Sequence, residues 1–79
     1  MDEVLSEKDR KTIRKCFGDH VRKKRLELNI SQEELAFKSG LHRTYVGSVE
    51  RGERNLSLEN IFVFAKALSC DPTELIPNL

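Results

Sequence analysis

Apolar residues recur at helical spacing along most of the chain, in segments separated by short polar breaks. In the longest segment they fall at positions 13, 17, 21 and 28, with Leu26 at the edge, which predicts one helix from about Glu7 to Leu28. Ser6 is a suitable N-cap for this helix, with Asp9 three residues later. Its first two turns are mostly charged, so we expect residues 1–12 to extend the helix beyond the core.

A second pattern, between Ser31 and Gly52, predicts two short helices joined by a tight turn. Ser31 and Glu34 have the spacing of a capping box, and Gly40 can adopt the left-handed conformation that ends a helix. The second helix is expected over about 42–51, where Gly52 stops it. The residues of this motif that we expect to face inward are Leu35, Ala36, Leu41, Tyr45, Val46 and Val49.

The C-terminal third predicts two further helices. One begins after Ser57, and its expected buried stripe is Leu58, Ile61, Phe62, Ala65 and Leu68. Asp71 before Pro72 marks a last short helix, since proline is preferred at the first helical position, and Leu75 and Ile76 can close the core. No alternating pattern of useful length appears, so we predict an all-α domain of five helices over residues 1–79.

The helix expected over 42–51 has two contrasting faces. Opposite its apolar side lie residues that are polar, basic or small, namely Arg43, Thr44, Gly47, Ser48 and Arg51. Such a face suits the major groove of DNA, because arginine pairs bidentately with guanine and small residues allow close backbone approach. The alternative is an ordinary solvated face on a helical hairpin.

Charge is unevenly distributed along the chain. The formal net charge of the 79 residues is only +1, but the segment from Lys8 to Arg25 holds nine lysines and arginines against two aspartates. A basic run alone is more often solvated surface than a binding site. Beside the helix pair, it strengthens the case for a nucleic-acid partner.

Residues that would support other chemistry are sparse. Cys16 and Cys70 are isolated and show no metal-ligand spacing, and two reduced thiols fit a cytoplasmic protein. The two histidines and scattered hydroxyls form no catalytic set, and no apolar stretch is long enough for a membrane span or signal peptide. We therefore expect no enzymatic activity, cofactor, metal or membrane partner.

A few apolar positions near the C-terminus suggest an interface. Val63 falls outside the predicted stripe, beside Phe64, and the tail adds Ile76 and Leu79. An exposed apolar patch on so small a chain favours a homodimer formed through these four residues. The alternative is that Phe64 and Ile76 complete the core of a monomer and Val63 is simply exposed.

Several motifs together resemble a known family. FGxxVRxxR, SQEELA, the SGL turn, RTYVxxVERG and AKALSCDPTEL run from Phe17 to about Ile76, and they resemble the helix-turn-helix family of lambdoid phage repressors. Within it, RTYV followed by ERxxRN is most similar to the controller proteins of restriction–modification systems. These are small dimeric regulators that bind operators ahead of their own gene and a nuclease gene, activating at low occupancy and repressing at high occupancy.

The resemblance implies a role for individual residues of the motif. Gln32 would bond a DNA phosphate, whereas Arg43 and Thr44 would reach base edges. Tyr45 would stand between the core and the phosphate backbone, and Ser48 would contact a base or the backbone further along the groove.

Other implied roles lie around the motif. Arg54 and Asn55 would contact the backbone or the neighbouring groove. Arg25 and Glu50 resemble an internal salt bridge that ties the first helix to the recognition helix. Glu33 is similar in place to an acidic residue that some relatives use to contact RNA polymerase.

Two residues depart from the family pattern. His42 replaces the usual serine or threonine N-cap; it either contacts a phosphate or has no role. Gly47 stands where relatives often carry serine, and a mid-helix glycine costs roughly 1 kcal/mol against alanine. Close approach to a thymine methyl could offset that cost, and simple drift is the other explanation.

Taken together, the residues and the resemblance predict a bacterial, cytoplasmic regulator, bound to the nucleoid when active. It would read a pseudo-palindromic DNA operator as a homodimer, with RNA polymerase as a further partner. The alternatives are an antitoxin or a phage-type repressor that uses the same fold with a protein partner. For an antitoxin only residues 1–12 could form the partner-binding extension, and for a phage repressor no second domain follows Leu79.

Overall fold

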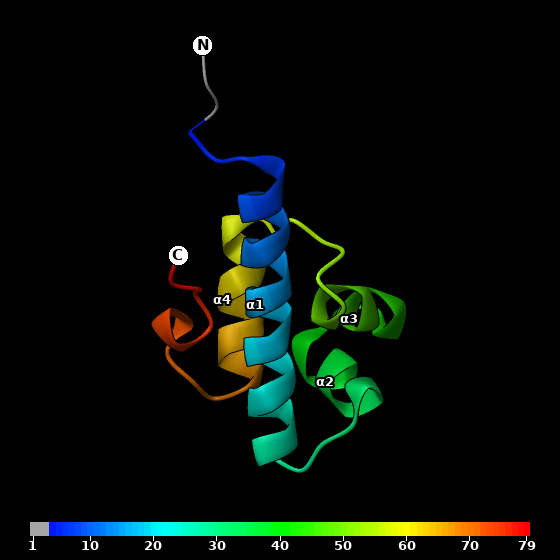
Figure 1. Cartoon of the computed structure of the whole chain (residues 1–79). Coiled ribbons are helices and arrows are strands. Elements are labelled where there is room, and N and C mark those ends of the chain that lie inside the picture. The colour runs from blue at the N-terminus through cyan, green and yellow to red at the C-terminus, as the bar shows by residue number, and fades with distance from the viewer. Residues whose placement is uncertain (1–3) are drawn as a thin grey trace.

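The structure is a computed structural model that describes residues 4–79, and the regular secondary structure within that range is all helical. The elements are α1 (Glu7–Glu27), α2 (Gln32–Ser39), α3 (Arg43–Glu50), α4 (Leu58–Ala67) and the 3-10 turn η1 (Pro72–Glu74). Figure 1 shows α1 at the centre, with α2 and α3 on one side and α4 and η1 on the other. The predicted all-α fold and its helix-turn-helix are confirmed.

The predicted fifth helix is wrong, because the segment after Asp71 forms only one 3-10 turn. Asp71 caps it as expected, and the Leu75 amide bonds the Pro72 carbonyl at 3.0 Å, the short-range bond of a 3-10 turn. Pro77 disfavours helical geometry at the residue before it, so the turn cannot lengthen into an α-helix.

Local signals in the sequence define the ends of the helices. The side chains of Ser6 and Ser31 each accept a hydrogen bond from the amide three residues later, at 3.0 Å, and both form capping boxes. Gly40 ends α2 with a positive φ of 73°. His42, in contrast, caps α3 with no side-chain hydrogen bond. Residues 4–12 continue into the start of α1, while residues 1–3 of the predicted extension lie outside the described part of the chain.

The core lies where α1, α3 and α4 meet over α2. Its fully buried members are Val21, Leu35, Val46, Val49, Phe64, Leu68 and Leu75, with Phe17, Ala36 and Ala65 nearly so. Three aromatic rings form its centre: Phe64 packs edge-on against Phe17 and stacks on Tyr45, with ring centroids 6.4 Å apart in both pairs.

Four residues predicted to be in the core are exposed instead. Leu58 and Phe62 are 72% and 56% exposed, because α4 is rotated so that Phe64 faces inward in their place. Leu28 follows the last turn of α1, and Ile76 follows η1; both are more than 40% exposed.

The backbones of α1 and α3 touch directly at a glycine. A Cβ atom on Gly18 would lie 2.3 Å from the Val49 carbonyl oxygen and 2.8 Å from that of Glu50. No other residue fits this contact without moving one helix. A second close approach follows α3, where a Cβ on Gly52 would lie 2.8 Å from the Cα of Lys15.

Candidate nucleic-acid interface

The outer face of α3 is narrower than its sequence predicts. Arg43, Thr44 and Arg51 are exposed, but Gly47 and Ser48 are buried. Gly47 is covered by neighbouring side chains: a Cβ there would lie 3.2 Å from a guanidinium nitrogen of Arg51 and 3.5 Å from the amide oxygen of Gln32. The prediction that Gly47 and Ser48 form part of an open face is therefore wrong for the DNA-free chain.

Ser48 already has two hydrogen-bond partners within the protein. Its hydroxyl donates to the Tyr45 carbonyl at 2.7 Å and accepts from the Arg54 Nε at 3.0 Å. The side chain is only 3% exposed as a residue. A contact between Ser48 and DNA would require Arg54 to move first.

Tyr45 is held from three sides at the edge of the core. The Arg54 guanidinium lies 5.6 Å above its ring, and Asn60 of α4 donates a hydrogen bond to its hydroxyl at 3.2 Å. The ring also stacks on Phe64. Asn60 was not identified from the sequence, where it is one of three polar residues in a mostly apolar helix.

A buried ion pair joins the two ends of the motif to α1, as the sequence predicted. Arg25 donates to both carboxylate oxygens of Glu50, from Nε at 2.7 Å and from Nη2 at 2.9 Å, and the two residues are 8% and 5% exposed. Arg25 also bonds the Ile30 carbonyl, and Gln32 donates to Glu50 at 3.1 Å. The hydrogen bonds that Arg25 donates to Glu50 raise the pKa of Arg25, so the guanidinium stays charged and committed to this pair.

The exposed arginines of α3 each face a carboxylate. Arg43 lies 3.7 Å from Glu33 at the start of α2, and Arg51 lies 2.9 Å from Glu53. The hydrogen bond between Arg51 and Glu53 raises the pKa of the arginine and lowers that of the glutamate. Such solvent-exposed pairs are weak and screened by salt. A phosphate or a guanine can therefore replace either carboxylate at small cost.

The other residues expected to contact DNA lie in three places. Asn55 is exposed in the loop after α3, where it borders the same shallow hollow as Arg51 and Lys11. His42 is exposed at the start of α3. Gln32 is half-buried beneath Arg51, with its amide turned to Glu50.

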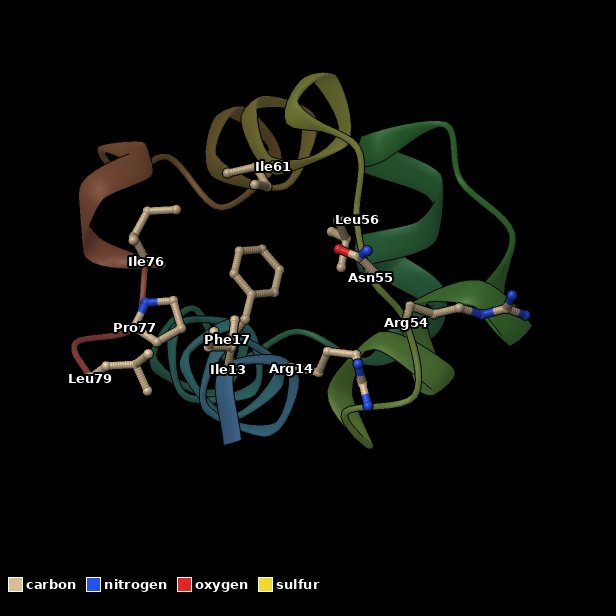
Figure 2. Close-up of a pocket in the computed structure, with 10 residues that line it drawn as sticks. All are labelled: Ile13, Arg14, Phe17, Arg54, Asn55, Leu56, Ile61, Ile76, Pro77 and Leu79. Atoms are coloured by element: carbon tan, nitrogen blue, oxygen red, sulfur yellow. The ribbon is translucent and has the colours of Figure 1, made fainter. Parts of the chain in front are cut away.

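Between α1, α4, the C-terminal tail and the loop residues 54–56 lies an apolar groove of about 390 Å³. Figure 2 shows Phe17, Ile61 and Ile76 facing the cavity, while the guanidinium groups of Arg14 and Arg54 point away from it. We call this the C-terminal groove. Its apolar lining residues are Ile13, Phe17, Leu56, Ile61, Ile76, Pro77 and Leu79.

The predicted dimer residues are not all on the surface. Phe64 is fully buried in the core, so its assignment to an interface is wrong, and Val63 is half-buried. Ile76 and Leu79 are exposed beside the C-terminal groove. The exposed apolar residues of α4 are Leu58 and Phe62, which the sequence pattern had placed in the core.

Other functional chemistry is limited in residues 4–79. They contain no cluster of three or more potential metal ligands and no helix both long and apolar enough to span a membrane. Cys16 and Cys70 are unbonded and half-buried, and burial raises the pKa of the Cys70 thiol.

Comparison with known proteins agrees with this geometry. The family model described as helix-turn-helix matches residues 21–75. The control protein C.BamHI of Bacillus amyloliquefaciens is 52% identical over 65 residues, covering 81% of this chain and 80% of that protein. The control protein C.SmaI of Serratia marcescens is 48% identical over 64 residues, covering 81% and 76%.

Solved structures give the same result. The restriction–modification controller protein C.AhdI from Aeromonas hydrophila is 53% identical with a TM-score of 0.76, covering 78% of this chain and 94% of that one. The controller C.Esp1396I, solved as a tetramer in complex with its natural 35 base-pair operator, is 34% identical with a TM-score of 0.72, covering 77% and 80%.

Proposed function

The chain belongs to the helix-turn-helix family and, within it, to the control proteins of restriction–modification systems, and we propose that it regulates transcription as a homodimer on a pseudo-palindromic operator. It is a DNA-binding transcriptional regulator. Its place of action would be the bacterial cytoplasm, on the nucleoid. In this proposal the domain spans residues 1–79, with the DNA-binding motif at 31–52 and the dimerisation segment within 57–79.

The observation that carries the proposal is the way α3 is held. Its buried end is tied to α1 and to the start of α2 through Glu50, Arg25 and Gln32, whereas Arg43 and Thr44 at its beginning are exposed. The amino-terminal part of a recognition helix is the part that contacts base edges. A helix that is fixed at its C-terminal end and exposes polar side chains at its N-terminal end is suited to contact base edges.

We assign the DNA contacts in two groups. Arg43 and Thr44 read base edges, and Arg51 contacts the backbone after exchanging Glu53 for a phosphate. Gln32 offers its remaining amide proton to a phosphate beside the start of α2, and Asn55 contacts the backbone from the loop. Tyr45, Ser48 and Arg54 form a linked set in which Arg54 turns toward the DNA and uncovers Ser48; Gly47 lets Gln32 and Arg51 approach α3 closely.

The dimer interface is proposed on α4 and the tail. Leu58 and Phe62 are one turn apart on α4 and more than half exposed, and Ile76 and Leu79 add exposed apolar surface. Val63 stands at the margin of this surface. Two protomers related by a two-fold axis would place two α3 helices in successive major grooves, which gives a small reader the affinity that one copy lacks.

Glu33 is proposed to contact RNA polymerase when the regulator activates. In the free protein its carboxylate faces Arg43 at 3.7 Å. When Arg43 turns to a base, Glu33 loses this partner and becomes available to another protein. Activation at low occupancy and repression at high occupancy then follow from how many dimers the operator holds.

The experiment that tests the proposal is selection of bound duplexes from a random DNA pool at near-physiological salt. We expect two inverted half-sites with centres about one helical turn apart. Arg43→Ala should cost about 1–3 kcal/mol on the selected operator and much less on random duplex, with Lys23→Ala, an exposed lysine of α1, as the matched loss of one charge. Salt-sensitive binding to every duplex without enrichment would instead direct the search to a protein partner.

A further inference from the structure

One face of α1 carries a row of basic side chains that the assigned DNA contacts do not use. Lys8, Lys11, Lys15 and Arg22 are separated by three, four and seven residues, a spacing that places them along one side of a helix. All four are exposed. We call this set the α1 basic row.

The row borders the proposed DNA-binding face. Arg22 and Lys15 line one shallow hollow together with Gln32 and Arg51. Lys15 and Lys11 line the next hollow, again with Arg51. The close approach of the Lys15 backbone to Gly52 fixes α1 against the end of α3, so the position of the row relative to α3 is set by backbone contact.

The charges of the row are only partly neutralised. Lys15 pairs with Asp19, and the nearby carboxylates of Glu53 and Glu50 are paired with Arg51 and Arg25. Among the described residues, no carboxylate lies within ion-pair distance of Lys8, Lys11 or Arg22. This face therefore presents a net positive charge along a length of about 21 Å, from the rise per residue of an α-helix.

Three of the four residues of the row lie outside the family module. The family model begins at residue 21, whereas Lys8, Lys11 and Lys15 belong to the earlier part of α1. The family model itself therefore assigns these positions no role.

We propose that the α1 basic row binds the phosphates of the DNA strand beside the groove read by α3, and so lengthens the contact that each protomer makes with the operator. The inference rests on the proposed function, because it takes the orientation of α3 on DNA as its starting point. Exposed basic side chains along one side of a rigid helix can lie beside several successive backbone charges of one strand, which recur about every 3.4 Å. They carry no base readout, so they add affinity without changing sequence preference.

The test compares the full-length protein with Lys8→Gln/Lys11→Gln, measuring Kd against salt concentration on the selected operator and on a random-sequence duplex. Each lost phosphate contact lowers the slope of log K against log salt by about 0.9. We expect a slope shallower by about 1–2 and affinities weaker by about tenfold or more on both duplexes, with an unchanged ratio between them. Both lysines are exposed and without an ion-pair partner in residues 4–79, so the fold should be retained.

The matched control is Lys23→Gln/Lys38→Gln, which removes the same charge elsewhere. Both lysines are exposed, Lys23 on α1 outside the row and Lys38 in the last turn of α2, and neither has an ion-pair partner within residues 4–79. An equal loss in this control, an unchanged slope in the test variant, or a changed operator-to-random ratio would each overturn the inference. If the wild-type protein binds no duplex, the proposed function itself fails; if the wild type selects an operator and Lys8→Gln/Lys11→Gln matches it, only the role of the row fails.

Discussion

The two sides of α1 are built in opposite ways. Toward α3, the helix packs backbone against backbone at Gly18, and a buried ion pair between Arg25 and Glu50 closes the end of the contact. Toward α4 and the tail, it leaves an apolar groove with exposed Ile76 and Leu79 at its rim. The first side is complete within one chain and holds the recognition helix still. The second side leaves apolar surface that a partner protomer can cover.

The largest effect on stability should come from breaking the ion pair between Arg25 and Glu50, on the side of α1 that packs against α3. Glu50→Ala leaves the Arg25 charge buried without its partner, which should cost about 3–5 kcal/mol in the free energy of unfolding. Urea denaturation followed by circular dichroism measures it. Glu53→Ala removes an equally charged but exposed partner of an arginine and should leave the midpoint nearly unchanged. Equal effects of the two variants would show that burial of the pair contributes nothing.

A second variant tests the backbone contact itself. Gly18→Ala places a methyl group against the carbonyl oxygens of Val49 and Glu50, and the two helices must separate. Overpacking of this kind costs about 1–3 kcal/mol, read from the same denaturation curves. In Gly40→Ala the added atom meets open space, and only the positive φ opposes it, at about 1 kcal/mol. A Gly18→Ala protein as stable as wild type would mean that the contact is looser than described.

A substitution on the exposed apolar surface of α4 should weaken dimerisation and leave the stability of the monomer unchanged. Phe62→Ser removes an exposed ring from α4 and should raise the dimer dissociation constant about tenfold or more, as expected for an aromatic residue central to an interface. Sedimentation equilibrium measures this change, and the unfolding midpoint extrapolated to low concentration should stay close to wild type. Phe37→Ser, on an isolated and 91% exposed ring of α2, is the control. A wild-type protein that is monomeric in this experiment would contradict the proposal that the exposed surface of α4 forms a dimer interface.

The smallest expected effect concerns the capping box of Ser31 and Glu34 at the start of α2. Hydrogen bonds from the Ser31 amide and hydroxyl lower the pKa of Glu34 below its ordinary value of 4.5. Because the folded-state pKa is depressed, this contribution is present above the unfolded-state pKa and is lost as pH falls through the folded-state value. Glu34→Gln should make the acid side of the stability–pH curve slightly flatter, whereas Glu33→Gln, one residue away and outside the capping box, should not. Parallel curves for wild type and Glu34→Gln would contradict this.

Helix caps and turns, which depend on a few consecutive residues, could be predicted from the sequence. The burial of side chains that depends on tertiary packing could not. The caps at Ser6 and Ser31 and the turn at Gly40 depend on a few consecutive residues, so local spacing identified them. In α4, two apolar stripes of helical period overlap, one through Leu58 and one through Phe64. Only the packing of α4 against the rest of the core decides between them.

The same distinction applies to the candidate site. The Arg25–Glu50 pair was predicted correctly through the family resemblance rather than through spacing, since the two residues are far apart in the chain. The burial of Ser48 depends on where Arg54 lies, and Arg54 is in a loop without periodic pattern. When a side chain from a loop covers a helix, the burial of the covered residue cannot be predicted from the sequence of the helix alone.

The surroundings of Tyr45 have a practical consequence. It is the chain's single tyrosine, and the chain has no tryptophan, so ultraviolet-excited emission comes essentially from this one ring. That ring touches the core through Phe64, α4 through Asn60 and the proposed DNA face through Arg54. The protein therefore carries a native, label-free optical reporter placed where folding, assembly and operator docking meet.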